Sequence, residues 1–141
     1  MPFKAKETLV RQAIEAIWNR GDLDAADKLF GPRYVNHHGV ISDLVLGPEA
    51  IKISAAFYRL AFPDLCVVIK ELSTDADMVV LRWTAASGSA GPACGNTFGT
   101  RGEKSLEGTT RCRFANGKII ESWTEWDQIG VLRDLAVSPA R

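Results

Sequence analysis

The pattern of apolar positions changes about halfway along the chain, from helical spacing to strand-like alternation. In Glu7–Asn19 the apolar residues recur at the i, i+3, i+4 and i+7 positions of an amphipathic helix. A second short helix is predicted over Asp22–Phe30, with Asp22 as its N-cap. A third begins at Gly47-Pro48, because proline is well tolerated at the first helical position. Between these two helices, Tyr34–His38 predicts a short extended segment.

From residue 65 onward the pattern is typical of strands. Leu65–Leu72 and Met78–Ala86 are rich in apolar and β-branched residues, and Ser105–Phe114 and Lys118–Trp126 alternate in side-chain type. Asn116-Gly117 joins the last two segments, and this dipeptide supplies the positive φ angles of a tight hairpin turn. Helices followed by a four-strand antiparallel meander predict a single α+β domain in which the helices cover one face of a curved sheet.

Composition and charge disfavour several classes of function and location for this chain. The chain has 141 residues, and 17 basic side chains balance 17 acidic ones, which disfavours a nucleic-acid partner. No apolar run is long enough to span a membrane, and the N-terminus lacks a signal-peptide pattern. Three widely spaced cysteines, Cys66, Cys94 and Cys112, predict reduced thiols and hence a cytoplasmic protein.

The final predicted strand has two different faces. Ile120, Ser122, Thr124 and Trp126 share one face by strict alternation, and Ile119 joins the charged and aromatic residues of the other. That second face contains Glu121, Trp123 and Glu125. A large ring among charges suits a protein interface better than open solvent, so we expect a homodimer that forms through this outer face of the sheet.

Several short segments, taken together and in this order, resemble the SnoaL-like polyketide cyclase family over roughly residues 8 to 136. They are Tyr34–His38, Gly47–Ile51, Phe62–Leu65, Arg82–Ala85, Asn116–Ile119 and Trp123–Leu132. The resemblance implies an NTF2-like (cystatin-like) cone, a homo-oligomer, no cofactor, and a cavity for a small hydrophobic organic molecule. Founding members of the family close a ring of an aromatic polyketide ester by intramolecular aldol condensation.

The chain departs from the founding cyclases at the residues that transfer protons. There the last strand carries a His, any residue and then an Asp, both facing the cavity, and the Asp is the acid/base. The corresponding positions here are Ser122 and Thr124, and a His expected on the neighbouring strand falls at Thr110. The resemblance turns these side chains toward the cavity, where they would donate hydrogen bonds beside a Trp126 wall. The alternative is that the small hydroxyls only fill space.

Three residues are candidates for the missing acid/base. His37 and His38 are the only histidines of the chain, and adjacent residues of an extended segment point oppositely, so one of them would enter the cavity next to Asn36. A zinc site is not expected, because no third ligand stands nearby in sequence. Asp127 could reach the cavity rim if the strand twists; otherwise it caps the following turn.

Further ligand-binding candidates are a cation and aromatic rings. Arg82 stands mid-strand, where it could hold a carboxylate or enolate, or pair with a strand neighbour such as Glu121. Trp18 and Phe57 are expected in the cavity wall or in the core.

Two hypotheses follow. The first is a cyclase-type enzyme, with His38, His37 or Asp127 as base and Ser122, Thr124 or Arg82 as hydrogen-bond donors. The second is a binding protein that keeps the cavity without catalysis.

Overall fold

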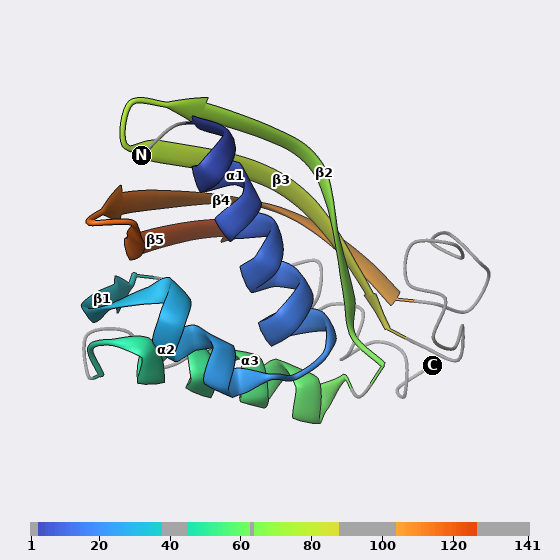
Figure 1. The fold of residues 1–141 in the computed structure, drawn as a ribbon. Coiled ribbons are helices and arrows are strands. Elements are labelled where there is room, and N and C mark those ends of the chain that lie inside the picture. Colours follow the sequence, from blue (N-terminus) through green and yellow to red (C-terminus); the bar gives the residue numbers. More distant parts are fainter. Residues whose placement is uncertain (1–2, 38–44, 63, 88–103, 127–141) are drawn as a thin grey trace, which may run out of the picture.

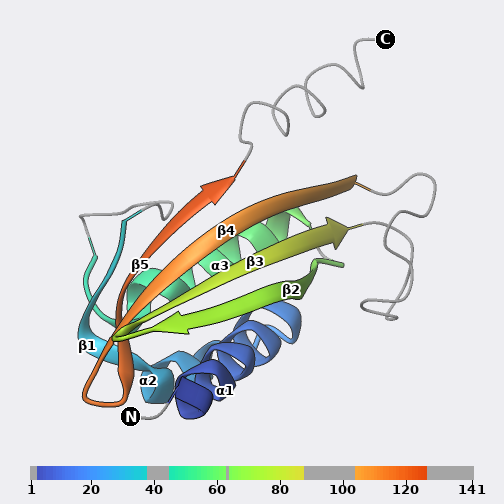
Figure 2. The ribbon, with the colours of Figure 1, turned by 90° about the horizontal axis from the view of Figure 1, so that it is seen from above.

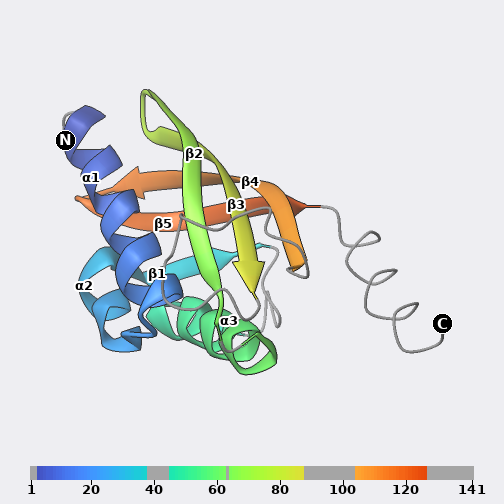
Figure 3. The same ribbon diagram turned by 90° about the vertical axis from the view of Figure 1, so that its right-hand side faces the viewer.

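The computed structural model describes residues 3–37, 45–62, 64–87 and 104–126. In chain order the elements are helix α1 (Phe3–Ala13), a π-helical turn (Ile14–Asn19), a 3-10 turn (Leu23–Ala25), the short helix α2 (Ala26–Leu29), strand β1 (Phe30–Asn36), helix α3 (Pro48–Ala61), and strands β2 (Cys66–Asp75), β3 (Met78–Ser87), β4 (Lys104–Ala115) and β5 (Lys118–Trp126). The α+β class is confirmed. Figures 1 and 3 show the helices gathered on one side of a bent sheet.

The sheet has the strand order β1-β5-β4-β3-β2. Strands β2 to β5 form the predicted antiparallel meander, and β1 pairs with β5 in parallel (Figure 2). The first three residues of the extended segment predicted at Tyr34–His38 are therefore the end of a longer edge strand, which spans Phe30–Asn36. Strand β1 continues through Gly31-Pro32, but its pairing with β5 shifts register between Phe30 and Val35. Proline is tolerated at a sheet edge or a bulge, where its missing N–H is not needed.

The first helix begins four residues before the predicted start and ends, through its π-helical turn, at the predicted Asn19. The second predicted helix is only a 3-10 turn and one α-helical turn, and Asp22 makes no side-chain capping hydrogen bond. Asp22 thus occupies the predicted N-cap position, but its side chain does not cap the turn. The largest fully buried side chains come from both layers: Val10, Ile17, Tyr34, Val79, Leu81 and Ile119.

The hairpin between β4 and β5 has the predicted turn and one unpredicted bulge. Asn116 and Gly117 have φ angles of 54° and 78°, as the turn requires. The register then shifts: Phe114 pairs with Ile119, whereas Arg113 pairs with Glu121, so that Ile120 is an extra residue in β5. The extra residue in β5 turns Ile119 into the core, where it is 1% exposed. Strict alternation placed Ile119 on the outer face, and this prediction was wrong.

None of the helices in the described ranges is long and apolar enough to cross a membrane.

Candidate functional site

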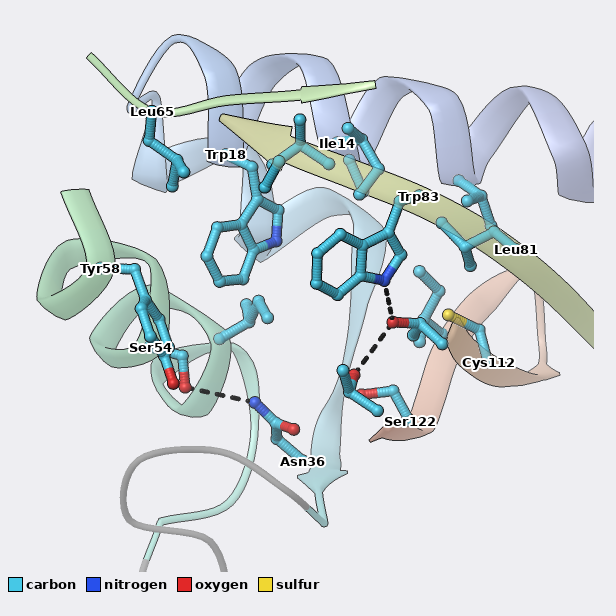
Figure 4. A pocket seen from close by; sticks show the side chains of 18 of the residues that line it. Ile14, Trp18, Asn36, Ser54, Tyr58, Leu65, Leu81, Trp83, Cys112 and Ser122 are labelled. Atoms are coloured by element: carbon cyan, nitrogen blue, oxygen red, sulfur yellow. Dashed lines mark hydrogen bonds between the residues drawn. The ribbon is translucent and has the colours of Figure 1, made fainter. Parts of the chain in front are cut away.

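A cavity of about 160 Å³ lies between the concave face of the sheet and the helices. Its walls are mainly apolar and aromatic: Ile14 and Trp18 come from the π-helical turn, Tyr58 from α3, and Leu81 and Trp83 from β3. Figure 4 shows the two indoles beside each other on one side of the pocket. The curvature of the sheet therefore leaves a cavity between the sheet and the helices, as the resemblance implied.

A set of neutral polar side chains crosses this apolar lining. We call it the polar band, and it consists of Ser54, Asn36, Ser122, Thr124 and Thr110. The last four come from neighbouring strands: Asn36 of β1 is aligned with Ser122 of β5, and Thr124 of β5 with Thr110 of β4. Sheet register thus brings residues that are far apart in sequence into two adjacent rows, Asn36 with Ser122 and Thr124 with Thr110.

Hydrogen bonds hold the polar band in place. Asn36 Nδ2 donates to Ser54 Oγ at 3.3 Å. The hydroxyl groups of Thr110 and Thr124 are hydrogen-bonded to each other, with 3.0 Å between their oxygens. The indole Nε1 of Trp83 donates to Thr110 Oγ1 at 2.9 Å (Figure 4). Because an indole N–H can only donate, it fixes Thr110 as its acceptor.

The phenol of Tyr34 adds a second hydroxyl pair beneath the polar band. Its oxygen lies 2.6 Å from Ser122 Oγ. Desolvation raises the pKa of Tyr34 far above its ordinary value, and although the hydrogen bond with Ser122 lowers it, burial dominates. Burial likewise raises the pKa of the Cys112 thiol to about 12. Both groups therefore stay neutral at physiological pH.

The described part of the cavity lining carries no formal charge. Among the described residues that line it, none is Asp, Glu, His, Lys or Arg. The described residues also hold no group of three or more His, Cys, Asp or Glu side chains that could bind a metal ion. What this lining offers a ligand is apolar and aromatic surface plus hydroxyl and amide hydrogen bonds.

Gly108 of β4 makes room for the Trp83 ring. The two residues are aligned in register, and a Cβ atom at Gly108 would lie 2.2 Å from Cζ2 of Trp83. The indole can therefore lie flat over β4 and reach Thr110. A glycine in the interior of a strand signals such a close approach, and this signal was available in the sequence. The contact between Trp83 and Gly108 was nevertheless not predicted.

A family model for SnoaL-like polyketide cyclases matches residues 8–135. The chain belongs to the SnoaL-like polyketide cyclase family. Similar solved structures include a candidate polyketide cyclase from Acidithiobacillus ferrooxidans, with 25% identity, a TM-score of 0.75 and 95% of each chain covered. No match was found among curated protein sequences.

Two further solved structures resemble the fold. TsrD from Streptomyces laurentii is 21% identical, with a TM-score of 0.77, 96% of this chain covered and 97% of that one. AclR, a candidate hydroxylase from Streptomyces galilaeus, is 24% identical, with a TM-score of 0.73, 96% of this chain covered and 98% of that one. The NTF2-like cone is thus confirmed.

Most of the predicted ligand-binding residues of this SnoaL-like chain meet in the cavity. Trp18, Asn36, Thr110, Ser122 and Thr124 all line it. Their predicted roles toward a ligand stay predictions. Strand β5 ends at Trp126, but the side chain of Trp126 lies outside the described set, as do His38 and Asp127.

His37 lies on the opposite face of the sheet from the cavity. Its ring stacks on Trp123 with 4.9 Å between centroids and 6° between planes. Its Nε2 lies 3.0 Å from Glu121 Oε2. A role for His37 as the cavity base therefore does not agree with its placement, and of the two histidines only His38 stays a candidate.

Arg82 and Phe57 also lie away from the cavity lining. Arg82 Nη1 pairs with Glu71 Oε1 at 2.9 Å, and the Arg82 side chain is 54% exposed. An ion pair was one of the two predicted alternatives, but Glu121 was the wrong partner. A register shift in β2 aligns Glu71 with Arg82. Phe57 is 50% exposed and packs edge-on against Tyr58.

Glu121 belongs instead to a cluster on the outer face. Its Oε1 accepts from Arg113 Nη1 at 2.7 Å, and the guanidinium carbons of Arg111 and Arg113 lie 5.9 and 5.3 Å from the Trp123 ring centroid. The mixture of ring and charges is the one expected for this face. The homodimer that it suggested stays a prediction.

The cysteine prediction was wrong at one position. Cys66 is disulfide-bonded, whereas Cys112 is a buried free thiol. The sequence shows no CxxC or other local signal for this bond, because the pairing depends on the fold. The prediction of a cytoplasmic protein therefore loses the support that three reduced cysteines would have given it.

Proposed function

We propose that this SnoaL-like chain binds a small, uncharged, ring-containing organic molecule with a carbonyl or hydroxyl group. The observation that carries this proposal is the neutral polar band across an otherwise apolar and aromatic cavity. Apolar walls favour a hydrophobic body, and a few placed polar groups fix its orientation. Trp18 and Trp83 supply flat surfaces for a ring.

The cavity volume bounds the size of the ligand. Its value of about 160 Å³ is close to the roughly 150 Å³ of an engineered cavity that takes up benzene. It is below the roughly 300 Å³ at which pockets for drug-sized molecules begin. A molecule of one or two fused rings is therefore the best fit.

The neutral lining bounds the charge of the ligand. A buried carboxylate or ammonium needs a counter-ion or several charge-assisted hydrogen bonds to replace its lost hydration. The described lining offers only hydroxyls, one amide, one thiol and indole N–H groups. An ionised ligand would be left without a charged partner in this lining.

The proposal is tested by calorimetric titration with 2-naphthol, naphthalene and 2-naphthoate. We expect 2-naphthol to bind more tightly than naphthalene, and 2-naphthoate to bind at least about 30-fold more weakly than 2-naphthol, because an unpaired ion in an apolar site is disfavoured by well over 2 kcal/mol. Thr110→Val should weaken 2-naphthol about 5- to 10-fold through a lost hydrogen bond. Thr109→Val, which changes the next residue on the other face, should leave the affinity unchanged. Equal affinity for the acid and the alcohol would contradict a neutral site.

Cyclase-type proton transfer is the second candidate function, and membership of the SnoaL-like family favours it. The Tyr34–Ser122 hydroxyl pair could donate to an oxyanion that forms on a bound carbonyl. The described lining contains no group that ionises near neutral pH, so the base would be His38 or Asp127.

Deuterium exchange at the α-carbon of 2-tetralone, followed by NMR, tests this second function. We expect exchange above the buffer rate, and a loss of about 100-fold or more in His38→Gln or Asp127→Asn, whichever removes the base. His37→Gln is the matched control, since His37 lies on the other face of the sheet and should have no effect. A wild-type rate equal to that of buffer would leave binding as the supported function.

A further inference from the structure

One end of the cavity is more open than the other. The lining residues Trp18, Tyr58 and Leu65 are partly exposed, whereas Val10 and Ile119 at the far end are 2% and 1% exposed. We call the open end the mouth. It is formed where the π-helical turn, the last turn of α3 and the start of β2 meet, and Figure 4 shows Trp18, Tyr58 and Leu65 near one another there.

Arg59 joins two of these elements. It follows Tyr58 in α3, and its Nη1 donates to the backbone oxygens of Trp18 and Asn19, at 2.7 and 3.0 Å. Carbonyl groups at the end of a helix lack partners within the helix, and a cation is favourable there. Arg59 therefore fixes the backbone that carries Trp18.

Asn19 joins the π-helical turn to the third element, the edge strand β2. Its Nδ2 donates to the oxygen of Val67 at 2.9 Å, and its Oδ1 accepts from the nitrogen of Val67 at 2.6 Å. The side-chain amide therefore pairs with Val67 as a neighbouring strand would. Val67 itself lines the cavity, so this contact sets the distance between Trp18 and the β2 wall.

The local backbone is built for this arrangement. Gly21 has a φ of 72°, and a Cβ atom there would lie 2.9 Å from Nε of Arg59. A larger residue would be strained in this conformation and would crowd the guanidinium. The π-helical turn just before it is a rare form that often occurs at functional sites.

We infer that Asn19 and Arg59 are positioning residues that hold Trp18 against Tyr58 and Val67 at the mouth, and that they thereby select ligands by size. This inference rests on the proposed function. Neither residue is expected to react with a ligand. The ring centroids of Trp18 and Tyr58 lie 6.1 Å apart, so a shift of the Trp18 backbone would change the opening directly.

Calorimetric titration of the full chain with a two-ring and a three-ring alcohol, 2-naphthol and 2-anthrol, tests the inference. In Arg59→Gln and in Asn19→Ala we expect 2-naphthol to bind about 5- to 10-fold more weakly, because Trp18 is no longer held in contact with this ligand. The larger 2-anthrol should bind as well as to wild type or better, because the mouth is wider. Arg82→Gln is the matched control, since it removes an exposed arginine on the outer face. A parallel change for both probes, or no change, would show a merely structural role and overturn the inference.

A readout without ligand separates this inference from the proposed function. Hydrogen exchange of the Trp18 indole N–H, followed by NMR, should be at least about 5-fold faster in Arg59→Gln than in wild type or Arg82→Gln, because the mouth opens more often. Unchanged exchange overturns the positioning role even if wild type binds both probes. If wild type binds neither probe, the proposed function and ligand selection both fail, whereas faster exchange would still show that Arg59 holds Trp18.

Discussion

Replacing Tyr34 with alanine is expected to lower the free energy of unfolding by about 3–5 kcal/mol. Tyr34 is 0% exposed, and its ring meets Phe30 edge-on, with 4.7 Å between centroids. The substitution would remove this packing, leave a hole beside the ligand cavity, and deprive Ser122 of its 2.6 Å partner. Urea denaturation followed by far-UV circular dichroism measures the change.

Tyr34→Phe is the matched control for the hydroxyl. It keeps the ring and removes only the hydrogen bond to Ser122, so the expected loss is about 0.5–1.5 kcal/mol. The difference between the two variants then isolates the packing of the ring. If Tyr34→Ala destabilises the chain no more than Tyr34→Phe, the ring of Tyr34 is not part of the core in the way the structure describes.

The hairpin and the cavity face of β5 could be predicted because they depend on local rules. Asn116-Gly117 determines the turn, and alternation then places Ser122 and Thr124 together on one face. The bulge could not be predicted, since an extra residue in a strand leaves no local sequence signal here. It reversed the predicted face of Ile119 and left Ser122 and Thr124 on theirs, because they lie after the shift.

The parts that depend on pairing between distant segments were harder to predict. The parallel addition of β1 to β5 is a long-range contact, and it is the register of this pair that aligns Asn36 with Ser122. Since neighbouring residues of an extended strand point oppositely, the same pairing sends His37 to the outer face, onto Trp123. Alternation alone predicts that only one of the two histidines faces the cavity, and it does not determine which one.

Ion-pair partners depend on register in the same way. Arg82 was recognised as an unusual mid-strand cation, yet its partner is Glu71, because β2 contains a register shift of its own. The predicted Glu121 lies two strands away and pairs with Arg113. Residue chemistry thus identified which side chains need a partner, and only the fold decided which partner each one has.

Placing a carboxylate in the polar band is expected to have the largest effect on stability. Ser122 is 6% exposed, and no cation lines the cavity among the described residues. In Ser122→Asp, burial without a counter-ion should raise the pKa of the new carboxyl by about 3–5 units. Each unit corresponds to about 1.36 kcal/mol, so the variant should lose about 4–7 kcal/mol more stability at high pH than at low pH.

The direction of this pH dependence follows from the raised pKa. The folded state holds the proton more tightly than the unfolded state, so the variant is most stable below the unfolded pKa of about 4 and loses stability as pH rises toward the folded pKa. Ser122→Asn is the matched control, because it has nearly the same shape and no charge, and the difference between the two variants should be small near pH 4. Urea denaturation of both from pH 4 to pH 9 measures the divergence. A Ser122→Asp curve parallel to that of Ser122→Asn would mean that the cavity accommodates charge, and the case for an uncharged ligand would then be lost.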